Sequence, residues 1–70
     1  MHEVLKKLGD TVKNLRNELG LSQEALAERC DFDRTYISLI ERGQRNPSLT
    51  NLIRLAEGLK VSTSNLIKGL

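Results

Sequence analysis

The chain has 70 residues, of which 39% are hydrophobic and 29% charged, with a formal net charge of +2. So short a chain has only a marginal core, so we expect a single domain over residues 1–70 that gains stability from burial against a second copy. One cysteine excludes an internal disulfide and suits a reducing cytoplasm. No apolar run approaches the ~20 residues of a membrane span, and the N-terminus lacks the apolar region of a signal peptide, so we expect a cytoplasmic protein.

The first predicted helix covers about residues 3–19. Its apolar side chains recur every three or four positions, a spacing typical of an amphipathic helix. They are Leu5, Leu8, Val12, Leu15 and Leu19. Gly9 interrupts the pattern at a cost of ~1 kcal/mol relative to alanine, so we expect the first two turns to fray. Gly20 lies where a glycine commonly terminates a helix.

Two short helices are predicted next, with a tight turn between them. Ser22 and Asp33 are good N-cap residues, and each has a hydrophobic staple around it. The staples are Leu21 with Leu26 and Phe32 with Ile37. Only residues 30–32 remain for the turn, which forces the helices to cross steeply, as in a helix-turn-helix.

The second of these helices has one apolar and one polar face. Ile37 and Ile40 lie on the side that faces the first helix of the pair. The opposite side carries four polar residues near the helix N-terminus, which are Arg34, Thr35, Tyr36 and Ser38. In a recognition helix, this is the part that meets base edges in the major groove.

Seven residues carry a resemblance to the Xre, Cro and phage-repressor helix-turn-helix family. They are Gln23, Ala27, Phe32, Ile37, Ile40, Glu41 and Gly43. The runs D-R-T-Y-I-S and I-E-R-G-Q-R-N resemble the controller proteins of restriction–modification systems, and the similarity extends over about residues 9–66. The resemblance implies an all-α, five-helix lambda-repressor-like domain whose helices 2 and 3 form the helix-turn-helix. It also implies a transcriptional regulator that controls its own promoter and neighbouring restriction–modification genes.

Two further helices are predicted after the recognition helix. Gly43 should end that helix in a left-handed conformation, and Pro47 forbids its continuation. Ser48 and Ser62 are the next N-caps. The fourth helix has more apolar residues than one narrow stripe needs, which are Leu49, Leu52, Ile53, Leu55, Ala56 and Leu59.

We expect the end of the chain and the exposed flank of the fourth helix to form a two-fold dimer seam, with Leu66, Ile67 and Leu70 in it. The alternative is that these three side chains only close the monomer core.

The candidate DNA contacts divide into residues that read bases and residues that hold the backbone. Arg34 can fork onto guanine, and Thr35 can bond a base edge or touch a thymine methyl. Ser38 lies one turn further along, and the resemblance adds Arg45 in the following loop. The candidate backbone contacts are Ser22, Gln23, Tyr36, Arg42, Gln44 and Asn46. We favour a phosphate contact for Tyr36, although its ring can pack on the domain instead. For all of these residues the alternative is a solvated surface side chain.

The resemblance also implies a structural ion pair between Arg16 and Glu41, which would tie the first helix to the end of the recognition helix; the alternative is a free surface arginine. Two residues depart from the family pattern. Asp31, in the turn, and Lys60, after the fourth helix, stand where relatives often have glycine. Asp tolerates positive φ better than most residues, so we expect the turn to form with some strain, and both departures bear on local stability more than on function.

Charge distribution separates the two halves of the chain. Residues 1–33 hold five basic and seven acidic side chains, whereas residues 34–70 hold six basic and two acidic ones. This is a modest electrostatic footprint for double-stranded DNA, and the alternative is that these are solvated surface charges. In the expected homodimer, two recognition helices about one turn apart would meet half-sites ~10 base pairs apart in a roughly palindromic operator. The sequence offers no catalytic set, metal-ligand cluster or phosphate-binding glycine loop, so we expect no enzyme, cofactor, metal or small-molecule ligand. Two alternatives stay open: an antitoxin or phage-adaptor protein-interaction module, and a phage-type repressor unrelated to restriction.

Overall fold

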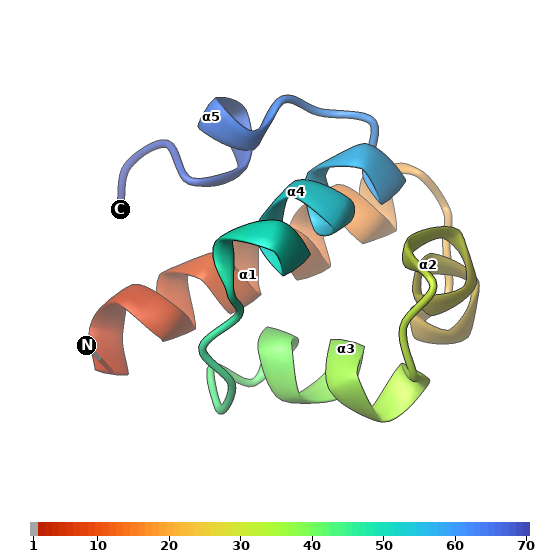
Figure 1. Cartoon of the computed structure of the whole chain (residues 1–70), viewed down its shortest axis with the longest axis horizontal. Helices are drawn as coiled ribbons and strands as arrows, with labels where there is room; N and C mark the ends of the chain where they lie inside the picture. Colours follow the sequence, from red (N-terminus) through yellow and green to blue (C-terminus); the bar gives the residue numbers. More distant parts are fainter. Residues whose placement is uncertain (1) are drawn as a thin grey trace.

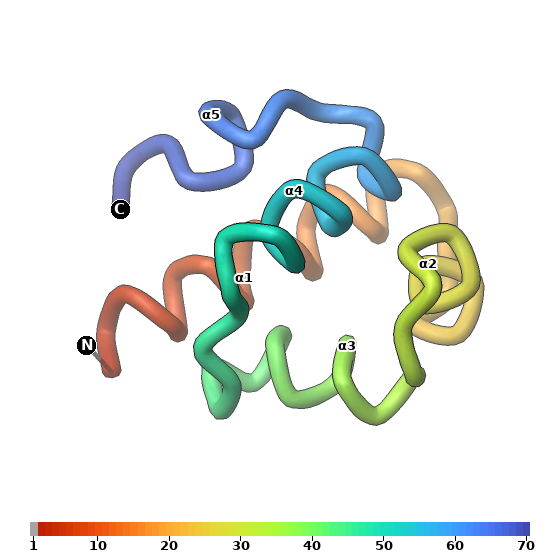
Figure 2. The backbone as a smooth tube through the Cα atoms, viewed as in Figure 1, coloured from red at the N-terminus to blue at the C-terminus, as the bar shows by residue number. Residues whose placement is uncertain are grey.

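The computed structural model describes residues 2–70, which form five helices and no strand (Figure 1). The elements are α1 (His2–Glu18), α2 (Gln23–Cys30), α3 (Arg34–Glu41), α4 (Leu49–Gly58) and α5 (Thr63–Leu66). The predicted all-α, five-helix class is therefore confirmed. The α3 and α5 helices lie at opposite edges of the molecule, with α1 and α4 between them (Figure 2).

One cluster of buried side chains draws on all five helices. It comprises Leu8, Val12, Leu26, Ala27, Cys30, Ile37, Ile40, Leu55, Ala56, Leu59 and Leu66. Because α3 sends both of its isoleucines into this cluster, its rotation about its own axis is fixed and its polar side must face outward. The core thus decides which residues of α3 are available for binding.

The glycine in the middle of α1 is a packing position. The helix runs through Gly9 without a break. A Cβ added there would lie 2.5 Å from the carbonyl oxygens of both Ile40 and Glu41, which is far inside van der Waals contact. Gly9 is therefore the point where α1 crosses the end of α3. The sequence interpretation of Gly9 as a mere interruption of the helix was wrong.

The α2–turn–α3 unit begins its helices where predicted, but Cys30, which was predicted in the turn, is the last residue of α2. The Ser22 hydroxyl oxygen accepts from the Ala25 amide at 3.0 Å. Asp31 ends α2 at φ 59°, the positive value that was predicted. Asp33 has the backbone of an N-cap, but its side chain makes no capping hydrogen bond, which corrects the prediction. This carboxylate is exposed and keeps its hydration, and α3 begins on backbone bonds from Tyr36 and Ile37 to the Asp33 carbonyl oxygen.

The last two helices begin as expected, but the structure buries one side chain of α5 that was expected at the surface. Ser48 and Ser62 cap α4 and α5, and Lys60, which stands where relatives often have glycine, adopts a positive φ of 60°. Leu66, which was predicted at the dimer seam, is fully buried in the monomer core. The prediction for Leu66 was wrong because apolar spacing in so short a helix does not tell which of two adjacent side chains turns inward. The neighbouring Ile67 remains 40% exposed.

Candidate nucleic-acid interface

The outer side of α3 carries the predicted base readers. Arg34 and Thr35 are exposed, and Ser38 is half-buried. Ile37 and Ile40, on the opposite side, are 0% and 1% exposed. In the part of the chain that the structure describes, the Arg34 guanidinium forms no hydrogen bond or ion pair. Its donors are therefore available to a ligand.

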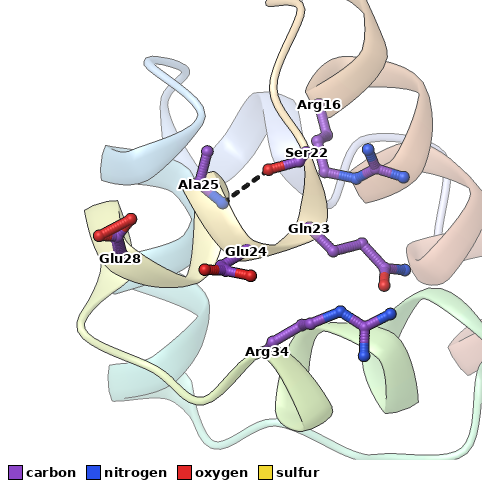
Figure 3. A pocket seen from close by; sticks show the side chains of 7 residues that line it. All are labelled: Arg16, Ser22, Gln23, Glu24, Ala25, Glu28 and Arg34. Atoms are coloured by element: carbon purple, nitrogen blue, oxygen red, sulfur yellow. Dashed lines mark hydrogen bonds between the residues drawn. The ribbon is translucent and has the colours of Figure 1, made fainter.

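A shallow concavity of about 600 Å³ lies beside Arg34, between the N-termini of α2 and α3. Arg16, Ser22, Gln23, Glu24, Ala25, Glu28 and Arg34 line it. Figure 3 shows the Gln23 and Arg34 side chains extending in the same direction along two sides of this concavity. The α2 N-terminus adds the positive end of a helix dipole, so the part of the concavity beside Gln23 and Arg34 suits an anion such as a phosphate group. Glu24 and Glu28 place negative charge on the rest of the lining, which makes that other part unfavourable for an anion.

A buried network ties α1 to the end of α3. The Arg16 guanidinium donates from Nε to Glu41 Oε2 at 2.6 Å and from Nη2 to Oε1 at 3.1 Å. Its Nη1 donates to the Leu21 carbonyl oxygen at 2.8 Å. The Arg16 and Glu41 side chains are 11% and 3% exposed. The hydrogen bond with Glu41 raises the pKa of Arg16, while burial acts in the opposite direction. The predicted structural pair is confirmed.

Gln23 is the third member of this network, which sequence reasoning missed. Its Nε2 donates to Glu41 Oε1 at 3.0 Å. Gln23 was predicted only as a contact to the DNA backbone. One N–H of its side-chain amide is bonded to Glu41, and the other N–H remains available. Glu41 therefore fixes the end of α3 against both α1 and the first residue of α2.

Tyr36 lies at the junction of α3, α4 and the loop after α3. Its ring packs on Phe32, with centroids 4.7 Å apart and planes tilted by 55°. Asn51 Nδ2 donates to the Tyr36 hydroxyl oxygen at 3.0 Å. The Arg45 guanidinium lies over the same ring, 5.3 Å from its centroid. The packing alternative for the ring is thus realised, whereas a phosphate contact by the hydroxyl stays a prediction.

Arg54 of α4 holds the helix-turn-helix turn, and no sequence pattern singled it out. Its guanidinium donates to the Cys30 carbonyl oxygen from Nε at 3.2 Å and from Nη2 at 2.8 Å, and to the Asp31 carbonyl oxygen from Nη2 at 2.7 Å. It also lies 4.3 Å from the centroid of Phe32. The last carbonyls of a helix lack partners within it, and a cation satisfies them well. Arg54 therefore supports a turn that has no glycine.

The loop after α3 presents the remaining predicted contacts. Arg42, Gln44, Arg45 and Asn46 are all exposed. Gly43 adopts the predicted positive φ of 72°, and a Cβ there would meet Lys6 Cα at 3.0 Å. The glycine therefore both reverses the chain and lets the loop approach α1. The four exposed polar side chains therefore follow the recognition helix directly in the chain.

Other kinds of site find no support in residues 2–70. No group of three or more His, Cys, Asp or Glu side chains gathers there in a way that suits a metal ion. Burial raises the pKa of the Cys30 thiol, as expected for a small hydrophobic core residue and not for a reactive one. None of the described helices has the length and apolar character needed to cross a membrane.

This fold, with its exposed polar recognition helix and basic loop, defines a helix-turn-helix protein. The helix-turn-helix family model matches residues 12–66, and the chain belongs to this family. It is therefore a DNA-binding transcriptional regulator and not an enzyme, as predicted.

The particular relatives are restriction–modification controller proteins, which confirms the resemblance drawn from the sequence. Control protein C.MunI from Mycoplasma sp is 45% identical over 94% of this chain and 90% of its own length. The crystal structure of the controller protein C.AhdI from Aeromonas hydrophila superposes with a TM-score of 0.86 at 45% identity, covering 89% of this chain and 94% of that one. The controller protein C.Esp1396I, solved as a tetramer in complex with its natural 35 base-pair operator, has a TM-score of 0.85 at 40% identity, covering 93% and 86%.

Proposed function

We propose that this regulator binds a roughly palindromic operator as a homodimer, and that it controls its own promoter and neighbouring restriction–modification genes. The observation that carries this proposal is the outward placement of Arg34 and Thr35 on a helix whose other side is locked into the core. The similarity to C.Esp1396I, which was solved in complex with its operator, supports operator DNA as the partner of this chain.

The base readers are proposed to divide the work by chemistry. Arg34 forks onto O6 and N7 of a guanine, and Thr35 bonds a base edge or contacts a thymine methyl. Ser38 and Arg45 extend the reading along α3 and into the loop. The proposed backbone contacts hold the register, and they are Ser22, Gln23, Tyr36, Arg42, Gln44 and Asn46.

The proposed dimer seam combines the exposed apolar residues of α4 with those at the end of the chain. Leu49 and Ile53 are 69% and 42% exposed, and Ile67 and Leu70 are 40% and 44% exposed. Leu66 is no longer part of the seam because it lies inside the monomer. Since α5 and α3 lie at opposite edges of the molecule, a second copy seated at the end of the chain leaves α3 uncovered (Figure 1). A two-fold dimer then presents two recognition helices to half-sites ~10 base pairs apart.

DNA binding is tested by titration against the duplex of the chain's own upstream region and against an unrelated duplex of equal length. We expect tight binding of the first that weakens steeply between about 50 and 200 mM salt. Arg34→Ala should cost about 1–3 kcal/mol on the preferred duplex and change background binding much less. The matched control is Lys13→Ala, which removes the same charge from an exposed position on α1. Equal affinity of the wild type for both duplexes would contradict sequence-specific binding.

Dimerisation is tested by sedimentation equilibrium at micromolar concentration. Ile67→Asp should convert the dimer to a monomer, because it places a charge in the proposed apolar seam. Leu19→Asp is the control, since Leu19 is equally exposed at 40% but lies at the end of α1. A wild-type monomer, or equal effects of the two substitutions, would count against the seam. Tolerance of Arg34→Ala together with capture of an unrelated protein chain would instead support the interaction-module alternative.

A further inference from the structure

The contact between Asn51 and Tyr36 joins the first turn of α4 to the first turn of α3. Asn51 Nδ2 donates to Tyr36 Oη at 3.0 Å, and both residues are half-buried. The backbone amide of Asn51 is used separately, because it donates to the Ser48 hydroxyl that caps α4. The side-chain amide is therefore not needed to begin α4, and its contact in the described structure is with Tyr36.

The direction of this hydrogen bond determines what the phenol can do next. An amide –NH₂ group only donates, so the phenol oxygen is the acceptor and its own proton must point elsewhere. In the part of the chain that the structure describes, no group accepts that proton. A phenol that already accepts one hydrogen bond is polarised to donate another. Asn51 thus leaves Tyr36 with a free donor at the junction of α3, α4 and the loop after α3, where a phosphate oxygen would accept it.

The same ring also carries a base reader from the loop. Arg45 lies over the Tyr36 ring at 5.3 Å from its centroid, within the range of a cation–π contact. In residues 2–70 the Arg45 guanidinium forms no hydrogen bond or ion pair, so its polar head contacts the protein through the Tyr36 ring. A displacement of Tyr36 would therefore remove the surface on which the Arg45 side chain lies. A chain of contacts runs from α4, through the recognition helix, to the loop after it.

We propose that Asn51 is a positioning residue for sequence-specific binding, which acts through Tyr36 on both the phenol donor and the Arg45 side chain. This inference rests on the proposed function, since it assigns a role at the same DNA surface. It does not require Asn51 to touch DNA. It predicts that the effect of Asn51 depends entirely on the hydroxyl of its partner.

A double-mutant cycle tests this dependence directly. Asn51→Ala, Tyr36→Phe and the combined variant are titrated against the tightest duplex obtained by in vitro selection with the wild type, and against a scrambled duplex. We expect Asn51→Ala to weaken binding of the selected duplex about fivefold, as for the loss of one neutral hydrogen bond. Binding of the scrambled duplex should change less than about twofold. In the Tyr36→Phe background, Asn51→Ala should have almost no further effect.

The matched control is Asn65→Ala, because Asn65 occupies the same position in α5 that Asn51 occupies in α4. Its backbone amide donates to the capping Ser62 hydroxyl in the same way, and it should leave both affinities and the melting temperature unchanged. A merely structural role of Asn51 would lower the melting temperature and weaken both duplexes alike, which would overturn the proposal. Unchanged or tighter binding of the selected duplex, or an equal loss in both Tyr36 backgrounds, would also overturn it. A wild type without preference for any selected duplex would instead contradict the proposed function itself, a result that the Arg34→Ala titration reveals independently.

Discussion

Replacing Glu41 with glutamine tests how the recognition helix is held in place. Three N–H donors converge on the Glu41 carboxylate, two from Arg16 and one from Gln23. Glutamine has nearly the same shape, but it offers one acceptor oxygen and turns an –NH₂ group toward a donor. Glu41→Gln therefore leaves a mostly buried guanidinium without its counter-charge.

The expected cost follows from burial and from what Arg16 retains. Removing one partner of a buried ion pair typically costs about 3–5 kcal/mol. Arg16 keeps its bond to the Leu21 carbonyl and is 11% exposed in its side chain, so we expect a smaller cost than this, about 2–3 kcal/mol. A chain of 70 residues is stabilised by only about 4–10 kcal/mol in total. With an unfolding entropy of ~0.15 kcal/mol/K for this length, the melting temperature should fall by about 14–20 °C.

The assay is thermal unfolding followed by circular dichroism, with every variant at the same protomer concentration because dimerisation would make the transition concentration-dependent. Glu57→Gln is the control: Glu57 is exposed on α4, and the same change there should cost less than about 0.5 kcal/mol. The double variant Arg16→Met with Glu41→Leu should be more stable than Glu41→Gln alone, since no buried charge is left unpaired. A shift below about 5 °C for Glu41→Gln would refute the reasoning, because it would mean that the carboxylate is dispensable to the packing of α3.

Three further substitutions probe the helix contacts, each by the same thermal unfolding. Gly9→Ala should destabilise the protein by about 2 kcal/mol or more despite the better helix propensity of alanine, because the added methyl would overlap the Glu41 carbonyl oxygen. A rise in melting temperature would contradict the close crossing of α1 over α3. Lys60→Gly should stabilise by about 0.5–1 kcal/mol, because glycine removes the strain at φ 60° and costs less in chain entropy than that strain, and a loss of stability would show that this strain is absent. Arg54→Met should cost about 1–2 kcal/mol through lost bonds to the Cys30 and Asp31 carbonyls, and an unchanged melting temperature would remove Arg54 as the support of the turn.

Local features of the structure were predictable from the sequence because their causes lie within a few residues. A serine followed by a helical pattern specifies its own cap, which is why Ser22, Ser48 and Ser62 all accept the expected amide bond. Gly43 and Asp31 were assigned positive φ for the same kind of local reason. The outward face of α3 followed from the spacing of its isoleucines.

Contacts between distant residues were not predictable in the same way. Gly9 has a helix on both sides in sequence, and only the crossing of α1 over α3 explains why no side chain fits there. The bonds of Arg54 to residues 23 and 24 positions earlier depend on where α4 passes the turn. Likewise, the apolar pattern at the chain end did not distinguish Leu66, which is buried, from Ile67, which is exposed. The Arg16–Glu41 pair was an exception, because resemblance to a family supplied the distant partner.

The α4 helix links the two proposed surfaces, and this affects how they should be tested. One flank carries Leu49 and Ile53, which are proposed to meet a second copy, while Asn51 and Arg54 on the same helix hold Tyr36 and the turn. A charge introduced at position 53 lies between Asn51 and Arg54 in the sequence, so we expect it to disturb DNA binding even in a monomer. Position 67 lies outside α4, beyond the end of α5. Loss of operator affinity in Ile67→Asp therefore reports on dimerisation. The same loss after a change in α4 could come from a weakened dimer or from a displaced Tyr36, and the double-mutant cycle with Tyr36→Phe separates these two causes.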